Sequence, residues 1–168
     1  MIRPVVKIPD PILRKKAQPV AKIDEAILRL VEDMKDTMYK EPGVGLAAPQ
    51  IGVSLRVIVW DSPENKEGFQ SLINPKIVKT EGQEKGLEGC LSIPDMSGEV
   101  VRYTSIQVEG IRPNGANVSL ALTDFTARIL QHEVDHIDGI LYIDRLSPAD
   151  RALVQKKLKK LHKVAPSL

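Results

Sequence analysis

The sequence contains a pair of histidines that can bind one metal ion. His132 and His136 are four positions apart in a segment whose apolar spacing predicts a helix, and residues at this separation lie on one helical face. Glu133 follows the first histidine, where a carboxylate can face the open position of a metal and accept a proton from bound water. The alternative is an exposed charged helix with two chance histidines. The well-capped predicted helix favours the metal site.

Two histidines need a third ligand to hold a catalytic metal. In one large class of zinc proteases a third histidine follows a glycine, but Tyr142 occupies that position here. Asp144 and Asp150 are the next acidic residues, and neither is well matched to a ligand position. Cys90 is the remaining candidate, beside Gly89, which lets the backbone approach an ion closely. A lone cysteine is usually a small buried apolar residue, but the missing ligand favours thiolate coordination.

A Cys-His-His site has two chemical consequences. Three protein ligands leave a fourth position for water, which is typical of a catalytic rather than a structural site. The thiolate also admits softer ions, so Fe²⁺ is expected to fit as well as Zn²⁺ or Ni²⁺.

Three segments of the chain resemble, in order, the three motifs of the peptide deformylase family. They are Gly43-Val44-Gly45-Leu46-Ala47-Ala48-Pro49-Gln50, Glu88-Gly89-Cys90-Leu91-Ser92 and Gln131-His132-Glu133-Val134-Asp135-His136. The resemblance covers nearly the whole chain and implies a single catalytic domain over residues 1–168. It implies removal of the formyl group from the N-terminal formyl-methionine of newly synthesised polypeptides. It also implies bound Fe²⁺ as the ion in the cell, replaceable by Ni²⁺, Co²⁺ or Zn²⁺.

The resemblance assigns a role to each matching residue. The implied metal ligands are Cys90, His132 and His136. A metal-bound water would attack the formyl carbon, with Glu133 as general base and then as the acid for the leaving amine. Gln50 and the backbone N–H of Leu91 would stabilise the oxyanion.

A second group of residues is expected to bind the substrate. Its members are Gly43, Val44, Gly45, Gly89, Phe125 and Ile129. Gly45 would pair with the substrate backbone, and the segments around Gly45 and Leu91 could form a wall with room for a formyl hydrogen but not for an acetyl methyl. Phe125 and Ile129 precede the ligands on a similar helical face, so they and Val44 are candidates for a methionine pocket. Core packing is the alternative for each of these three.

The sequence also departs from the family pattern. Some members carry a substrate-contacting arginine shortly after the cysteine motif, whereas Asp95-Met96-Ser97 occupies that stretch here. Arg102 matches a second, structural arginine and is expected to pair with Glu88. Arg128 lies one turn before the histidine pair, so it is expected either at the pocket mouth or simply exposed.

The composition limits the class of protein. The chain has 168 residues and a formal net charge of +2, which is too balanced for binding to DNA by bulk charge. One cysteine excludes an intrachain disulfide, and no apolar run approaches the roughly 18 residues of a membrane span. The N-terminus lacks a signal-peptide core. These features predict a cytoplasmic protein without membrane or DNA partners.

The remaining pattern predicts an α+β fold, with short, mostly antiparallel strands packed around a central metal-bearing helix. Helices are expected at 24–40, 125–138 and 148–163. Strands are expected at 55–60, 71–73, 76–79, 105–111 and 118–122. Four prolines within the first twenty residues predict an extended N-terminal arm over the body.

The predicted C-terminal helix, 148–163, is basic. Its charged residues are Asp150, Arg151, Lys156, Lys157, Lys159, Lys160 and Lys163. An amphipathic helix docked on the body explains this composition, and the family resemblance adds a compatible role, contact with ribosomal RNA near the tunnel exit.

Two other functions fit part of the pattern. A zinc endopeptidase would share the histidine pair, but its downstream third ligand is missing. A non-catalytic metal- or ribosome-binding protein would need neither Glu133 nor Gln50.

Overall fold

The fold is seen in a computed structural model that describes residues 1–64 and 66–164, with only the backbone beyond residue 160. Leu161, His162 and Lys163 of the predicted basic helix therefore lie outside the described side chains. With η for 3-10 helices, the order is η1 (Pro11–Arg14), α1 (Glu25–Lys40), β1 (Gly45–Ala47), η2 (Ala48–Ile51), β2 (Val57–Trp60), β3 (Gln70–Glu81), β4 (Glu84–Cys90), β5 (Ile93–Arg102), β6 (Ser105–Ile111), β7 (Asn117–Thr123), α2 (Asp124–Ile137), η3 (Tyr142–Arg145) and α3 (Pro148–Val164).

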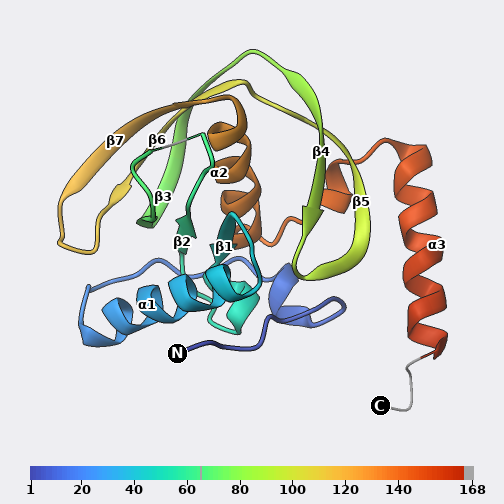
Figure 1. The fold of residues 1–168 in the computed structure, drawn as a ribbon, viewed down its shortest axis with the longest axis horizontal. Coiled ribbons are helices and arrows are strands. Elements are labelled where there is room, and N and C mark those ends of the chain that lie inside the picture. The colour runs from blue at the N-terminus through green and yellow to red at the C-terminus, as the bar shows by residue number, and fades with distance from the viewer. Residues whose placement is uncertain (65, 165–168) are drawn as a thin grey trace.

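The strands form two antiparallel sheets. A five-stranded sheet has the order β1-β2-β3-β6-β7, and β4 pairs only with β5. Figure 1 shows α2 between the larger sheet and the β4–β5 hairpin, with α3 on the outer side of β5. The predicted α+β class, with antiparallel strands around a central helix, is confirmed.

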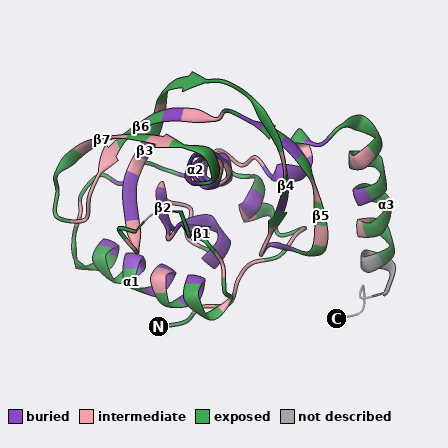
Figure 2. Ribbon diagram, turned by 45° about the horizontal axis from the view of Figure 1, so that its top comes forward, coloured by how far each residue is buried: buried purple, intermediate pink, exposed green. Residues whose placement is uncertain are grey.

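Most of α2 is enclosed by the rest of the protein. From Thr126 to Ile137 every residue is buried except Arg128 and His132, which are half-buried. Its apolar residues pack with β2, β3 and β6 in one core cluster, and Figure 2 shows the purple helix at the centre of the molecule. A helix enclosed in this way must find partners inside the protein for its polar side chains.

Predicted caps begin α1 and α3 and a predicted glycine ends α2, but the side-chain cap expected at the start of α2 is wrong, since Thr123 makes no capping hydrogen bond there. Asp24 accepts a hydrogen bond from the Ile27 N–H at 3.1 Å, which begins α1. Ser147 does the same for the Asp150 N–H at 3.2 Å, which begins α3. Gly139 follows α2 with a φ of +76°, a backbone conformation that favours glycine.

The strand predictions were correct in part. The segments predicted at 71–73 and 76–79 form one strand, β3, because Asn74 takes a positive φ of 52° and the register shifts there without ending the strand. The β4–β5 hairpin and the short β1 were not predicted. Glycines and charged residues interrupt the β4–β5 segment, so its composition carries little strand signal.

The N-terminal arm and the first part of α3 pack against the body. The N-terminal arm is held to α2 by the Ala17 N–H, which donates to the Ile137 carbonyl at 2.8 Å. On α3, Val154 is buried in a cluster with the β4–β5 hairpin, whereas Leu153 is 60% exposed. Within the described residues, no helix has the length and apolar character needed to cross a membrane.

Replacing Gly139 with alanine should lower the free energy of unfolding by about 2 kcal/mol or more. The positive φ strains any L side chain, and a Cβ at Gly139 would lie 2.6 Å from the Arg14 carbonyl oxygen. Urea denaturation measures the change. Gly52→Ala is the matched control, because Gly52 has a φ of +85° with no atom near its Cβ position. Equal losses in the two variants would show that the close contact with the arm costs nothing.

Candidate metal centre and active site

Two elements bring three metal-binding side chains together. The histidines at 132 and 136 project from α2, and Cys90 ends β4. Cys90 Sγ lies 3.3 Å from His136 Nε2, which lies 3.2 Å from His132 Nε2. All three ligand atoms lie within 4.8 Å of one another. Tetrahedral ligands at bond lengths of about 2.0–2.3 Å have separations of this size.

The protonation of the histidines also fits a metal site. His132 Nδ1 is 3.0 Å from Glu88 Oε1, so in the neutral ring the Nδ1 proton can be donated to the carboxylate, which leaves the Nε2 lone pair free for a metal. Burial lowers the pKa of His136 well below its usual range, which keeps that ring neutral. Burial also acts to lower the pKa of His132, but hydrogen bonds to Cys90 and Glu88 outweigh it and raise the pKa to about 10. Metal binding at His132 therefore displaces a proton.

Glu133 is enclosed beside these ligands. Its side chain is buried, and no hydrogen-bond partner for Oε1 exists among the described residues. Burial raises the pKa of Glu133 to about 7. Gly45 passes so close that a Cβ there would lie 2.6 Å from Glu133 Oε2 and 2.9 Å from Ile129, which only a residue without a side chain permits.

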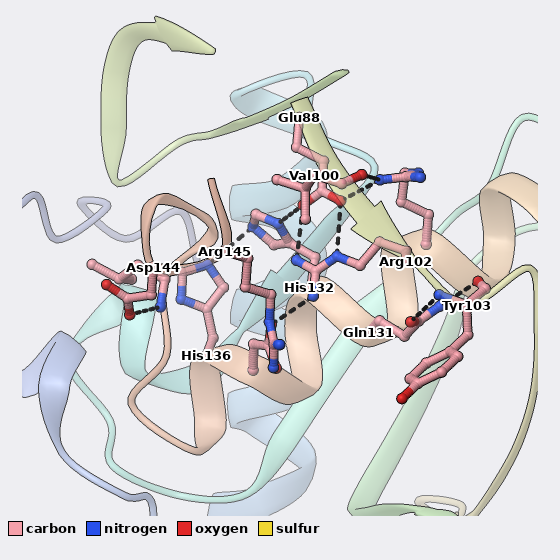
Figure 3. Close-up of polar contacts among 12 residues, drawn as sticks. Glu88, Val100, Arg102, Tyr103, Gln131, His132, His136, Asp144 and Arg145 are labelled. Carbon is pink, nitrogen blue, oxygen red and sulfur yellow. Dashed lines mark hydrogen bonds and ion pairs between the residues drawn. The ribbon is translucent and has the colours of Figure 1, made fainter. Parts of the chain in front are cut away.

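A buried carboxylate at Glu88 organises the back of the site (Figure 3). It accepts hydrogen bonds from Arg102 Nε at 2.8 Å and Nη2 at 2.9 Å, and from Arg128 Nη1 at 2.6 Å. The expected Arg102–Glu88 pair is therefore present. Burial raises the pKa of Glu88, but the hydrogen bonds from Arg102 and His132 outweigh burial, so its pKa lies well below the usual range.

Two further residues extend this network away from the metal ligands. Arg102 Nη1 donates to Asp135 Oδ2 at 2.6 Å, and Arg145 donates to both oxygens of Asp135 at 2.6 and 2.8 Å. Sequence reasoning missed Asp135 and Arg145 as parts of the site. Asp135 stands inside the histidine motif, and its burial on an enclosed helix is the signal that it needs a cationic partner.

Arg128 does not project freely into solvent. In addition to Glu88, it donates to the carbonyls of Val100 at 3.0 Å and Glu84 at 2.8 Å, so it joins α2 to the hairpin. It also lines the cavity. The expectation that Arg128 is simply exposed is therefore wrong, since only 11% of its side chain is exposed.

A cavity of about 530 Å³ opens over the metal ligands. Its size is within the range of small-molecule sites. Its lining includes every predicted site residue except His136: Gly43, Val44, Gly45, Gln50, Gly89, Cys90, Leu91, Phe125, Ile129, His132 and Glu133. Lys7, Glu41, Leu87 and Asp95 also line it and were not predicted as site residues.

The side chain of Gln50 has a fixed orientation in this cavity. Its Oε1 accepts the Ala47 N–H at 2.9 Å, so the Nε2 amide points the other way, 3.2 Å from Ser92 Oγ and 3.6 Å from Cys90 Sγ. Gln50 is buried at 2% exposure. A donor is thus held rigidly beside the metal ligands.

The Polypeptide deformylase family model matches residues 2–152 of the chain. The chain belongs to this family. The predicted family and the prediction of a hydrolase enzyme are confirmed.

Individual deformylases agree over most of the chain. A peptide deformylase of Symbiobacterium thermophilum is 54% identical over 141 residues, which are 84% of this chain and 65% of that relative. One of Dehalococcoides mccartyi is 45% identical over 98% of this chain and 93% of its own. A crystal structure of a peptide deformylase from Legionella pneumophila superposes with a TM-score of 0.90 at 41% identity, covering 100% of this chain and 99% of that one.

Glu88→Gln should lower the free energy of unfolding by about 3 kcal/mol. The substitution leaves Arg128 without its carboxylate partner and weakens the hold on His132, so metal affinity should fall about 10- to 100-fold as well. Urea denaturation and competition with a metal chelator measure the two effects.

Glu99→Gln is the control for this substitution. Glu99 lies on the same hairpin and its side chain is 58% exposed. Its one polar side-chain contact among the described residues is a 3.9 Å pair with Lys85, so its loss should change stability by less than about 0.5 kcal/mol. If the two variants behave alike, the Glu88 network does not stabilise the site.

Proposed function

We propose that this protein removes the formyl group from the N-terminal formyl-methionine of newly made polypeptides and releases formate. The observation that carries the proposal is the convergence of the Cys90, His132 and His136 donor atoms with Glu133 and Gln50 at one cavity, in a chain of the deformylase family. The single cysteine favours a reducing compartment, and we propose the cytoplasm as the place of this reaction.

Cys90, His132 and His136 would hold the divalent metal. One thiolate and two imidazoles suit Fe²⁺, the ion we expect in the cell, and also Ni²⁺, Co²⁺ or Zn²⁺. When bound, such an ion supplies positive charge that polarises the formamide and makes water more acidic.

Glu133 would move the proton during hydrolysis. A carboxylate with a pKa of about 7 is poised to take a proton from water and return it to the leaving amine at neutral pH. Its unpartnered, buried Oε1 supports this role, because that atom has no structural hydrogen bond to break. Gly45 leaves the carboxylate the space it occupies.

Gln50 and the N–H of Leu91 would stabilise the oxyanion that forms when water adds to the formyl carbon. The Ala47 N–H fixes the Gln50 amide with its NH₂ group toward the ligands. A donor aimed before the reaction needs no reorganisation in the transition state. As a neutral amide, Gln50 donates without competing as a base.

The remaining lining residues would select the substrate. The glycines at 43, 45 and 89 allow the peptide backbone to approach, and the Gly45 and Leu91 segments would exclude an acetyl methyl group. Ile129 is buried and can form the floor of a methionine pocket, whereas Val44 and Phe125 are 39% and 37% exposed and lie at its rim.

The decisive experiment measures formate release from formyl-Met-Ala-Ser by protein loaded anaerobically with Fe²⁺ and, in parallel, with Ni²⁺. Turnover should fall at least about 100-fold in Glu133→Ala while the metal stays bound. Glu99→Gln should match the wild type, and the acetylated peptide should be a poor substrate.

Two results would contradict the proposal. A metal-loaded wild type without turnover would refute deformylation, and cleavage of an unformylated internal peptide would favour an endopeptidase instead. Equal rates on the formyl and acetyl peptides would refute the excluding wall.

Contact of α3 with the ribosome near the tunnel exit is a further part of the proposal. Lys156, Lys157, Lys159 and Lys160 are exposed on this helix and can contact phosphates. Replacing all four with glutamine should weaken co-sedimentation with ribosomes and reduce its salt dependence, without changing turnover of the small peptide. Unchanged co-sedimentation would contradict this contact.

A further inference from the structure

Three consecutive residues of the N-terminal arm bind both segments that carry the proposed oxyanion donors. The Val6 N–H donates to the Gln50 carbonyl at 2.7 Å. Lys7 Nζ donates to the Leu91 carbonyl at 2.9 Å. The Ile8 N–H donates to the Ser92 carbonyl at 3.0 Å.

The two segments belong to different parts of the fold, and besides the arm they are joined by packing of Leu91 against the cluster that contains Ala48 and Ile51. Gln50 belongs to η2, which follows β1 of the five-stranded sheet, whereas Leu91 and Ser92 form the turn of the β4–β5 hairpin. Across this gap, the direct hydrogen bonds of the described residues come from the Gln50 side chain itself. The hairpin ladder also shifts register between Gly89 and Cys90, so strand pairing holds the turn less tightly.

The arm itself is firmly placed. Val6 and Ile8 are half-buried and pack, with Cys90, against a core cluster that includes Leu13 and Ile93. Lys7 lies between them, and its side chain reaches the lining of the cavity. Figure 1 shows the arm, in dark blue, at the same end of the molecule as the β4–β5 turn.

We propose that residues 6–8 act as a strap that holds the two oxyanion donors at their working separation, with Lys7 as its positioning residue. The inference rests on the proposed function. Hydrogen-bond donors help a developing oxyanion only when they lie about 2.7–3.1 Å from it, so a turn that drifts by a fraction of an ångström loses much of their effect. Lys7 restrains the carbonyl of Leu91, the residue whose N–H is the second donor.

Lys7→Met tests the strap, because methionine keeps most of the apolar stem and removes the donor. For formyl-Met-Ala-Ser, kcat should fall about tenfold while KM changes by less than about twofold, since the donors act mainly in the transition state. The bound metal per chain should stay the same. Lys7→Arg, which keeps a charged donor, should recover most of kcat.

Lys15→Met is the matched control. Lys15 is an exposed lysine of the same arm, and its side chain has no hydrogen bond or ion pair within the described residues, so this variant should match the wild type. A wild-type kcat in Lys7→Met would overturn the strap, as would a loss that Lys7→Arg fails to recover. A loss that disappears at high salt would also overturn it, because screening removes a charge effect and not a positional one.

Hydrogen–deuterium exchange tests the strap separately from activity. Amides of the 89–93 turn should exchange faster in Lys7→Met than in the wild type or in Lys15→Met, and unchanged exchange would overturn the strap. If the metal-loaded wild type releases no formate, the proposed function fails by itself. If the wild type is active and Lys7→Met equals it, only the strap fails.

Discussion

The site depends on one buried carboxylate. Glu88 accepts hydrogen bonds from two arginines and lies 3.0 Å from a histidine ring nitrogen, and these partners come from two different elements. Arg102 ends β5, while Arg128 and His132 stand one turn apart on α2. A single carboxylate therefore joins the hairpin to the central helix and orients one metal ligand. Removing one partner of such a cluster leaves uncompensated charge inside the protein, so the cluster persists only as a whole.

Much of this site could be predicted from sequence because its residues lie in short segments with local rules. The four-residue spacing of the histidines fixes a shared helical face, and Asp24 and Ser147 mark helix starts through hydrogen bonds to nearby backbone. The pairing of Arg102 with Glu88 was expected from the family resemblance alone, and the second arginine on Glu88, Arg128, was not expected. The extension of this network through Asp135 to Arg145 was not expected either, because partners brought together by tertiary packing leave no local pattern.

The β4–β5 hairpin shows why some elements could not be predicted from the sequence. Its strands are held by pairing with each other and by contacts to α2 and η3, rather than by an alternation of apolar and polar residues. Gly86 is needed where the Arg128 guanidinium passes, since a Cβ there would lie 2.8 Å from it. In the sequence that glycine marks only a break in strand propensity. The glycine that makes β4 hard to predict is therefore the residue that leaves room for the Arg128 side chain.

The enclosure of α2 separates positions where a substitution disturbs the fold from positions where it does not. Nearly every residue of the helix serves either the core or the ligand cluster, so a substitution there disturbs stability and chemistry together. The exposed residues that line the cavity, such as Val44, Leu87 and Phe125, belong neither to the core nor to the ligand cluster. Exchanging the rim side chains can therefore change which molecules enter the cavity, while the cluster of metal-binding side chains stays intact beneath them.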